Sequence, residues 1–158
     1  MGNLQGIAPQ SIKLLFENEQ LNIIKILSLL QVLKNKSKKK FYKVEDVIFY
    51  YSLVNFDLIK LLNEDVNNLM KNRNRYLRFN KSVNQIILEL INLKYIDIKG
   101  NLSSKKEQLG IRLNEEGEAF VKIFDSKYFL DLAEIYQKVI TNISNDTVNK
   151  NKVRGLLK

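Results

Sequence analysis

Apolar residues recur at helical spacing through the first part of the chain. Beyond Pro9, which is well placed to open a helix, they return every three or four residues as far as Leu33. This spacing predicts either one long helix or two helices that are separated near residues 18–20. A loop follows at residues 34–40, where lysines gather and no acidic residue occurs.

Residues 44–55 predict a second helix, because Glu45 and Asp46 would stand in its first turn, where the helix dipole favours negative charge. Its apolar residues are distributed over every side of the helix, so the helix is either central to the core or half buried in a partner. We carry both interpretations forward, since the pattern does not separate them. The aromatic residues that would form the partner interface are Phe49, Tyr50 and Tyr51.

A short amphipathic piece at residues 58–70 is followed by a second cationic segment at residues 71–81. This segment holds five basic residues and no acidic one, and it includes three of the five arginines of the chain. Two interpretations of this segment remain. Its cations bind phosphates while Tyr76 and Phe79 stack on bases, or the segment is a solvated connection that these two aromatic residues anchor to the core. The candidate nucleic-acid-binding residues here are Arg73, Arg75, Arg78 and Lys81.

The next pattern is a helix, a hairpin and another helix. Asn80 or Ser82 can cap a helix that ends near Leu93, and residues 95–99 and 108–113 alternate as two strands would. Asn114 can then cap a helix that continues with apolar spacing to about residue 143. The predicted fold is therefore mainly α with a small β-hairpin, a winged helix-turn-helix with N- and C-terminal helical extensions.

This layout divides the chain into three parts: an N-terminal extension at residues 1–19, a winged-helix-type helical domain at 20–143, and a flexible basic tail at 144–158. The longest apolar segment, residues 21–33, is too short and too polar to span a bilayer. The first residues also lack the charged-then-apolar pattern of a signal peptide. We therefore expect a cytoplasmic protein without a membrane partner.

The chain has no cysteine, histidine or tryptophan. This excludes disulfides, thiolate or imidazole metal sites, and every catalytic triad with an imidazole base. Acidic residues do occur in adjacent pairs near predicted helix starts, but neighbours on a helix diverge by roughly 100° and chelate one ion poorly. We expect no cofactor, no metal and no enzymatic activity. The acidic pairs are Glu45/Asp46, Glu64/Asp65 and Glu115/Glu116.

The net charge of +9 makes an anionic partner plausible. On the predicted hairpin, Lys105, Lys106 and Arg112 would add to a contact with double-stranded DNA. The helix before the hairpin is poorly suited to reading bases. Its outward face would place Glu89 against phosphates, and it carries no arginine that could contact guanine. Leu88 points away from the main apolar stripe of this helix and is a candidate for a protein contact.

Two stretches carry a resemblance to winged-helix proteins, namely residues 90–96 at the helix exit and residues 112–117 before the following helix. Over roughly residues 20–140, the order of elements also resembles the small middle component of bacterial three-component systems built around an SMC-like ABC ATPase, such as Lamassu anti-phage defence. The resemblance implies a non-catalytic accessory subunit that binds the ATPase and an effector, typically a nuclease.

Two other functions share the predicted fold. One is a free-standing homodimeric winged-helix transcriptional regulator, which needs an operator and a dimerisation helix. The other is a kleisin-binding subunit of a condensin, which usually contains two winged-helix units where this chain has room for one.

Overall fold

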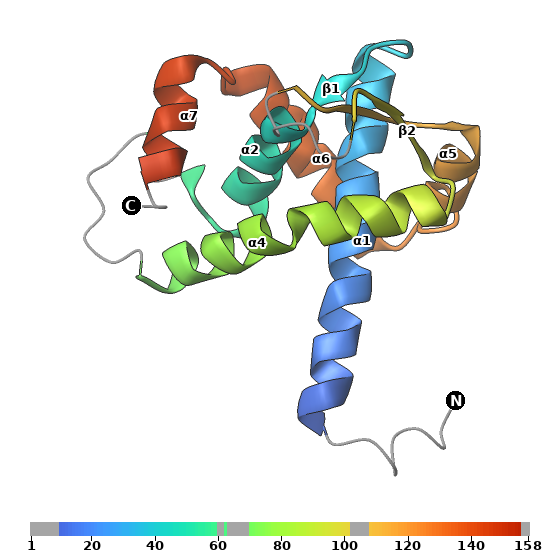
Figure 1. Cartoon of the computed structure of the whole chain (residues 1–158), viewed down its shortest axis with the longest axis horizontal. Helices are drawn as coiled ribbons and strands as arrows, with labels where there is room; N and C mark the ends of the chain where they lie inside the picture. Colours follow the sequence, from blue (N-terminus) through green and yellow to red (C-terminus); the bar gives the residue numbers. More distant parts are fainter. Residues whose placement is uncertain (1–9, 60–61, 63–69, 102–107, 156–158) are drawn as a thin grey trace.

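Helices make up most of the chain, and a small antiparallel sheet lies against them (Figure 1). The computed structural model describes residues 10–59, 62, 70–101 and 108–155. The mainly helical fold predicted from the sequence is confirmed at this level. The helices of the described part are α1 (Gln10–Lys36), α2 (Val44–Asn55), α4 (Met70–Asn92), α5 (Glu115–Val121), α6 (Lys127–Asn142) and α7 (Thr147–Arg154), and its strands are β1 (Tyr42–Lys43), β2 (Ile96–Lys99) and β3 (Gly110–Leu113).

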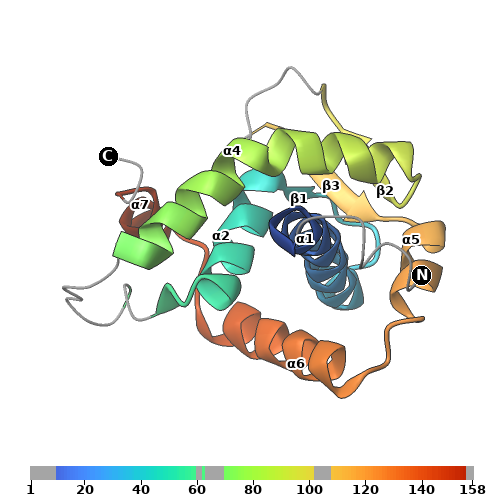
Figure 2. The same cartoon turned by 90° about the horizontal axis from the view of Figure 1, so that it is seen from below.

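Helix α2 is enclosed by α1, α4, α6 and α7 (Figure 2). Every side chain from Val47 to Leu53 is buried, which a helix allows only when packing partners surround it. The structure therefore supports the interpretation that this helix is central to the core. The assignment of Phe49, Tyr50 and Tyr51 to a partner interface is corrected, because their side chains are only 3%, 6% and 0% exposed within the core of the chain itself.

Polar groups at the ends of buried side chains hold α2 to its neighbours. The Tyr51 hydroxyl donates to the Asn22 side chain of α1 at 2.9 Å, and the Asn55 amide donates to the Tyr136 hydroxyl of α6 at 2.8 Å. Burial raises the pKa of all three tyrosines of this region, that of Tyr50 to about 12. They therefore stay protonated, and each keeps a hydroxyl that satisfies a polar partner inside the core.

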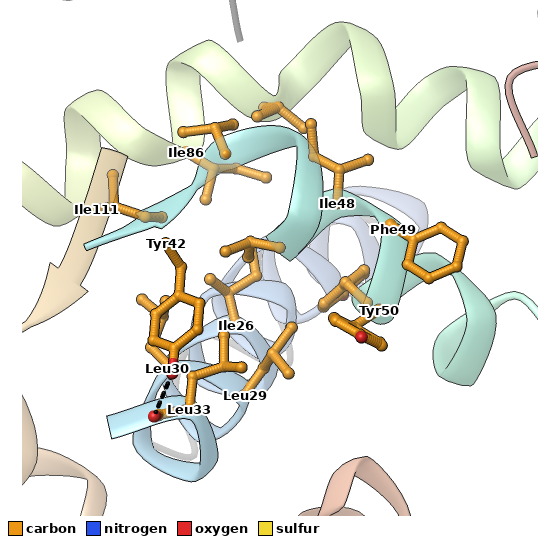
Figure 3. Close-up of a cluster of buried hydrophobic side chains, with 14 of the residues drawn as sticks. Ile26, Leu29, Leu30, Leu33, Tyr42, Ile48, Phe49, Tyr50, Ile86 and Ile111 are labelled. Atoms are coloured by element: carbon orange, nitrogen blue, oxygen red, sulfur yellow. Dashed lines mark hydrogen bonds between the residues drawn. The ribbon is translucent and has the colours of Figure 1, made fainter. Parts of the chain in front are cut away.

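The sheet has three strands in the order β1-β3-β2, all antiparallel, and the two strands of the predicted hairpin are present. Strand β1, which the sequence pattern did not predict, pairs Tyr42 with Ile111 of β3. The Tyr42 hydroxyl donates to the Leu33 carbonyl at 3.0 Å, and Figure 3 shows its ring beside the leucines of α1. The sheet is therefore fixed to the core through α1 as well as through its own strands.

Helix α1 is one continuous helix, and its N-terminal end projects beyond the rest of the described chain (Figure 1). Helix α4 begins at Met70, so the cationic segment at residues 71–81 is helical and not a connecting loop. The physical reason is the buried face that Tyr76 and Phe79 form with Val83. Val83 begins the apolar stripe of the predicted helix, and Tyr76 and Phe79 extend that stripe by about two turns toward the N-terminus.

The helix predicted from Asn114 to about residue 143 is interrupted. Asn114 does cap α5, since its side chain accepts from the Gly117 amide at 2.8 Å, but α5 ends at Val121 and α6 starts only at Lys127. Both helices contact α1, but they pack differently: Gly117 of α5 lies against Leu113 at the end of β3, whereas α6 buries Tyr136 against α1 and α2. One straight helix could not reach both places, so the chain turns between them.

The segment predicted as a flexible tail, residues 144–158, contains the helix α7 in its described part. Asp146 caps α7 by accepting from the Asn149 amide at 2.8 Å, and Val153 is 2% exposed. Lys150 forms ion pairs with Glu45, at 3.1 Å, and with Asp46, both in the first turn of α2. The acidic pair that suits the α2 dipole therefore also holds α7 in place.

None of the helices within the described ranges combines the length and the apolar character that a membrane crossing needs.

We expect Gly117→Ala to destabilise the fold. A Cβ at this position would lie 2.3 Å from the Tyr95 carbonyl oxygen and 2.6 Å from a Leu113 methyl group, and neither can move without disturbing the sheet. Overpacking of this kind costs about 1–3 kcal/mol. Urea unfolding followed by circular dichroism measures the loss. Gly155→Ala is the matched control, because nothing lies within 4 Å of its added Cβ, and an equal loss in both variants would contradict this account of Gly117.

We expect Lys150→Ala to destabilise the fold by about 1–3 kcal/mol, because it leaves the largely buried Asp46 carboxylate without its cation and leaves Glu45 with Arg154 alone. Burial alone lowers the pKa of Lys150, but hydrogen bonds to Asp46 and Glu45 outweigh it and hold the pKa above its ordinary value of 10.5. The contribution of Lys150 is therefore complete below that value and is lost as the pH rises beyond it.

Unfolding measured at pH 8 and above pH 11 should give a clear difference between Lys150→Ala and wild type at the lower pH only. Lys138→Ala is the control, since Lys138 forms an exposed pair with Glu134 on one helix and should contribute little. A difference that persists undiminished at high pH would exclude the ion pairs as its cause.

Candidate nucleic-acid interface

Helix α4 separates its aromatic residues from its cations. It is 23 residues long, about 35 Å, and it buries Tyr76 and Phe79 against the core. Arg75, Arg78 and Lys81 are exposed. Since these cations follow one another at intervals of three residues, about one helical turn, they line up along the solvent side of α4. We call these three residues the basic face of α4.

Arg75 stands at the edge of the basic face and is positioned by an aromatic cluster. Its guanidinium carbon lies 5.3 Å from the centre of the Phe56 ring, within the range of a cation–π contact. Phe56 packs edge-on against Phe79, which in turn stacks on Tyr51 with 4.3 Å between ring centres. The core of α2 thus fixes where this exposed arginine lies.

Arg78 and Lys81 are exposed and form no ion pair with any residue that the structure describes. Their charges are therefore not neutralised within that part of the chain and can meet an anion from solution. Arg73, the other arginine predicted in this set, is half-buried and has an interaction of its own. The structure thus brings three of the four predicted cations onto one exposed face.

Base stacking by this segment does not fit the structure. Tyr76 and Phe79 are 3% and 6% exposed, so neither ring can reach a base. Of the two sequence interpretations for these aromatics, anchoring to the core is the one the structure supports. What α4 offers a nucleic acid is charge for phosphates, which carries no sequence information.

The hairpin adds less than the sequence predicts. Lys105 and Lys106 lie outside the described residues. Arg112 is engaged within the chain: its Nε donates to Asp97 at 3.3 Å, its Nη1 donates to the Lys39 carbonyl at 3.1 Å, and its guanidinium carbon is 4.2 Å from the centre of the Phe41 ring. Arg112 therefore joins the sheet to the loop before β1, and it is not an exposed cation for phosphate.

Leu88, the remaining interface candidate, is 39% exposed on α4. Lys81 and Leu88 are seven residues apart on this helix, and Glu89 beside Leu88 is also exposed. The basic face therefore lies in the N-terminal half of α4 and ends before Leu88 and Glu89.

Sequence reasoning missed the place of α7 next to α4. The charge of Arg154 is close enough to act on Tyr76 of α4, whose pKa is raised by burial and pulled back by that charge. Arg154 is also paired with Glu45 of α2. The signal that could have revealed this helix is the Asp146 cap followed by helical spacing to Val153, which the polar composition of the tail obscured.

A cleft of 600 Å³ lies between the end of α1, strand β3 and the start of α5. Four of its eight charged lining residues pair with each other: Lys34 contacts Glu118 at 3.0 Å and Arg112 contacts Asp97. The other four are of both signs, so the cleft presents no excess of one charge to an anion. The hydrogen bond from Lys34 is the main cause that lowers the pKa of Glu118. Within the described ranges, no group of three or more metal-ligating side chains is present. The basic face of α4 is therefore the better candidate site.

No protein-family model matches the chain, and no curated protein or solved structure is detectably similar to it.

We expect the chain to bind double-stranded DNA without sequence preference and to lose that binding when the basic face is changed. Each phosphate contact contributes a slope of about −0.9 in log affinity against log salt, so replacing two cations reduces the slope by about 2. Fluorescence anisotropy with an arbitrary duplex at several salt concentrations compares wild type with Arg78→Ala/Lys81→Ala.

The control for this measurement is Lys122→Ala/Lys138→Ala, which removes two exposed cations from α6 and from the C-terminal end of α5. An equal effect of both double variants would mean that net charge matters and that the position on α4 does not.

Proposed function

We propose that this chain is a non-catalytic accessory subunit of an SMC-like ATPase anti-phage complex. In this role it bridges the ATPase and an effector nuclease, and its α4 contacts DNA without sequence preference. The observation that carries the proposal is the presence of two chemically different surfaces on one small core. The first is the basic face of α4. The second is a set of exposed apolar side chains between Ile123 and Ile135.

The order of the elements supports a winged-helix arrangement for this subunit. A helix, a short strand, helix α2, helix α4 and two further strands follow one another, and the sheet order is β1-β3-β2. In winged-helix proteins the helix before the hairpin enters the major groove. In this chain that position belongs to α4, the helix that carries the exposed cations.

The chemistry of α4 favours contact with phosphates over the reading of bases. Its aromatic residues are turned inward and its outward cations lie in the N-terminal half of the helix, while Glu89 near its C-terminal end would meet phosphates unfavourably. A subunit that accompanies an ATPase along DNA needs this kind of sequence-independent contact. A regulator with a defined operator needs base contacts that α4 offers poorly.

Co-expression with the ATPase and nuclease of neighbouring genes tests the proposal. We expect a tagged chain to retain both partners through affinity and size-exclusion chromatography, with masses confirmed by mass spectrometry. The complex should persist after nuclease treatment, because proteins and not DNA hold it together. A chain that never associates with a neighbouring ATPase would falsify the proposal.

A homodimeric DNA-binding regulator is the second candidate, and the position of α4 before the hairpin favours it. That function requires a stable dimer and a preferred sequence. Light scattering on the isolated chain and footprinting of its own promoter would separate the two functions. A dimer with a protected operator would reverse their order.

A further inference from the structure

The outer face of the sheet carries two lysines in one row. Residues that lie opposite each other on antiparallel strands point to the same side, and Gly110 of β3 is opposite both Lys43 on β1 and Lys99 on β2. The inner face holds Tyr42 and Ile111, which belong to the buried cluster of Figure 3. Side chains alternate along a strand, so Lys43 and Lys99 point outward, and both are exposed.

Gly110 leaves a gap between the two lysines. Neighbouring strands lie about 4.8 Å apart, so the backbones at Lys43 and Lys99 are about 10 Å apart across β3. A Cβ on Gly110 would lie 3.6 Å from the Cβ of Lys99 and 3.1 Å from that of Phe41, which places these positions on one side of the sheet. Because glycine has no side chain, a ligand can approach the backbone of β3 between the two ammonium groups.

The neighbouring row of the outer face is already neutral. Arg112 of β3 lies opposite Asp97 of β2 and pairs with it at 3.3 Å, and its guanidinium also covers the Phe41 ring. Lys43 and Lys99, in contrast, form no ion pair with any residue that the structure describes. The charge that this face presents to solvent therefore comes from these two lysines.

Two lysines on either side of a gap suit a phosphodiester backbone. A lysine ammonium binds phosphate as a point charge, whereas the planar fork of an arginine matches a carboxylate better. Arg112 is occupied by Asp97, so an acidic protein segment would find no free guanidinium on this row of the sheet. A nucleic-acid strand repeats its charge at regular intervals and can bring successive phosphates to both lysines. The outer face therefore favours a nucleic acid.

We propose that the row of Lys43, Gly110 and Lys99 binds the phosphate backbone of double-stranded DNA, as a contact separate from the basic face of α4. The backbone passes over Gly110, and the lysines donate to phosphate oxygens from its two sides. Helix α4 contributes Ile86 to the cluster on the inner side of the sheet (Figure 3), so the two surfaces face different directions. The inference rests on the proposed function only because it extends the DNA contact of that function.

Lysine footprinting of the full chain tests the proposal. Acetylation rates are measured by mass spectrometry with and without a saturating amount of an arbitrary duplex. We expect the duplex to slow acetylation of Lys43 and Lys99 several-fold. Lys122 and Lys138 are the matched controls, since both are exposed at the end of α5 and on α6, and their rates should not change.

The variant Lys43→Gln/Lys99→Gln gives a second measurement. It should reduce the slope of log affinity against log salt by about 2, because two phosphate contacts are lost. Lys43 precedes α2 without a side-chain hydrogen bond to the helix, so its replacement leaves the start of α2 intact. Circular dichroism checks the fold, and Lys122→Gln/Lys138→Gln should leave the slope unchanged.

The outcomes separate this inference from the rest of the proposed function. Protection of Lys81 on α4 without protection of Lys43 and Lys99 overturns the inference and leaves the α4 contact in place. Equal protection of the row by polyglutamate at the same ionic strength would assign it to an acidic protein and would also overturn the inference. Absence of protection at all three lysines removes both DNA contacts, and co-purification with the ATPase then tests the accessory role alone.

Discussion

The fold depends on the need to enclose helix α2 completely. Seven consecutive buried side chains, from Val47 to Leu53, leave this helix with no face for solvent. Two of these residues are tyrosines, and their hydroxyls must find partners when they are buried. Tyr51 reaches Asn22 on α1 and Tyr50 reaches the Ile143 carbonyl at the end of α6, so the polar ends of core residues decide which elements lie where.

This enclosure explains why the C-terminal segment is helical. The first turn of α2 carries Glu45 and Asp46, whose carboxylates are largely buried and need a cation. Lys150 supplies that cation, and only a helix that packs beside α2 can place it there while burying Val153. An acidic pair that is favourable to one helix thus recruits a second helix that is distant in the sequence.

The sequence alone predicts those parts of the fold whose determinants are local. The bounds of α2, the Asn114 cap and the two hairpin strands follow from short patterns, and the structure contains all of them. Other features depend on distant partners. Strand β1 is two residues long and exists because β3 lies beside it, and α5 separates from α6 because both pack on α1 but α6 also reaches α2. The residues of these features carry no local sequence pattern that predicts them.

The candidate site also has one part that the sequence predicts and one part that it does not. Helical spacing is enough to group Arg75, Arg78 and Lys81, once the segment is known to be a helix. The roles of the aromatic residues could not be predicted, because burial depends on what packs against them: Tyr51 is the stacking partner of Phe79, and both belong to the core. The same holds for Arg112, whose contacts with Asp97 and the Lys39 carbonyl arise only after the sheet has formed.

The enclosure of α2 also decides how the two candidate surfaces are related. Helices α4 and α6 cover opposite sides of α2 (Figure 2), so their outward faces point away from each other. A ligand on the basic face of α4 therefore does not compete for space with a protein on the outward face of α6. A core arranged in this way can connect a nucleic acid to a protein without any change of its own conformation.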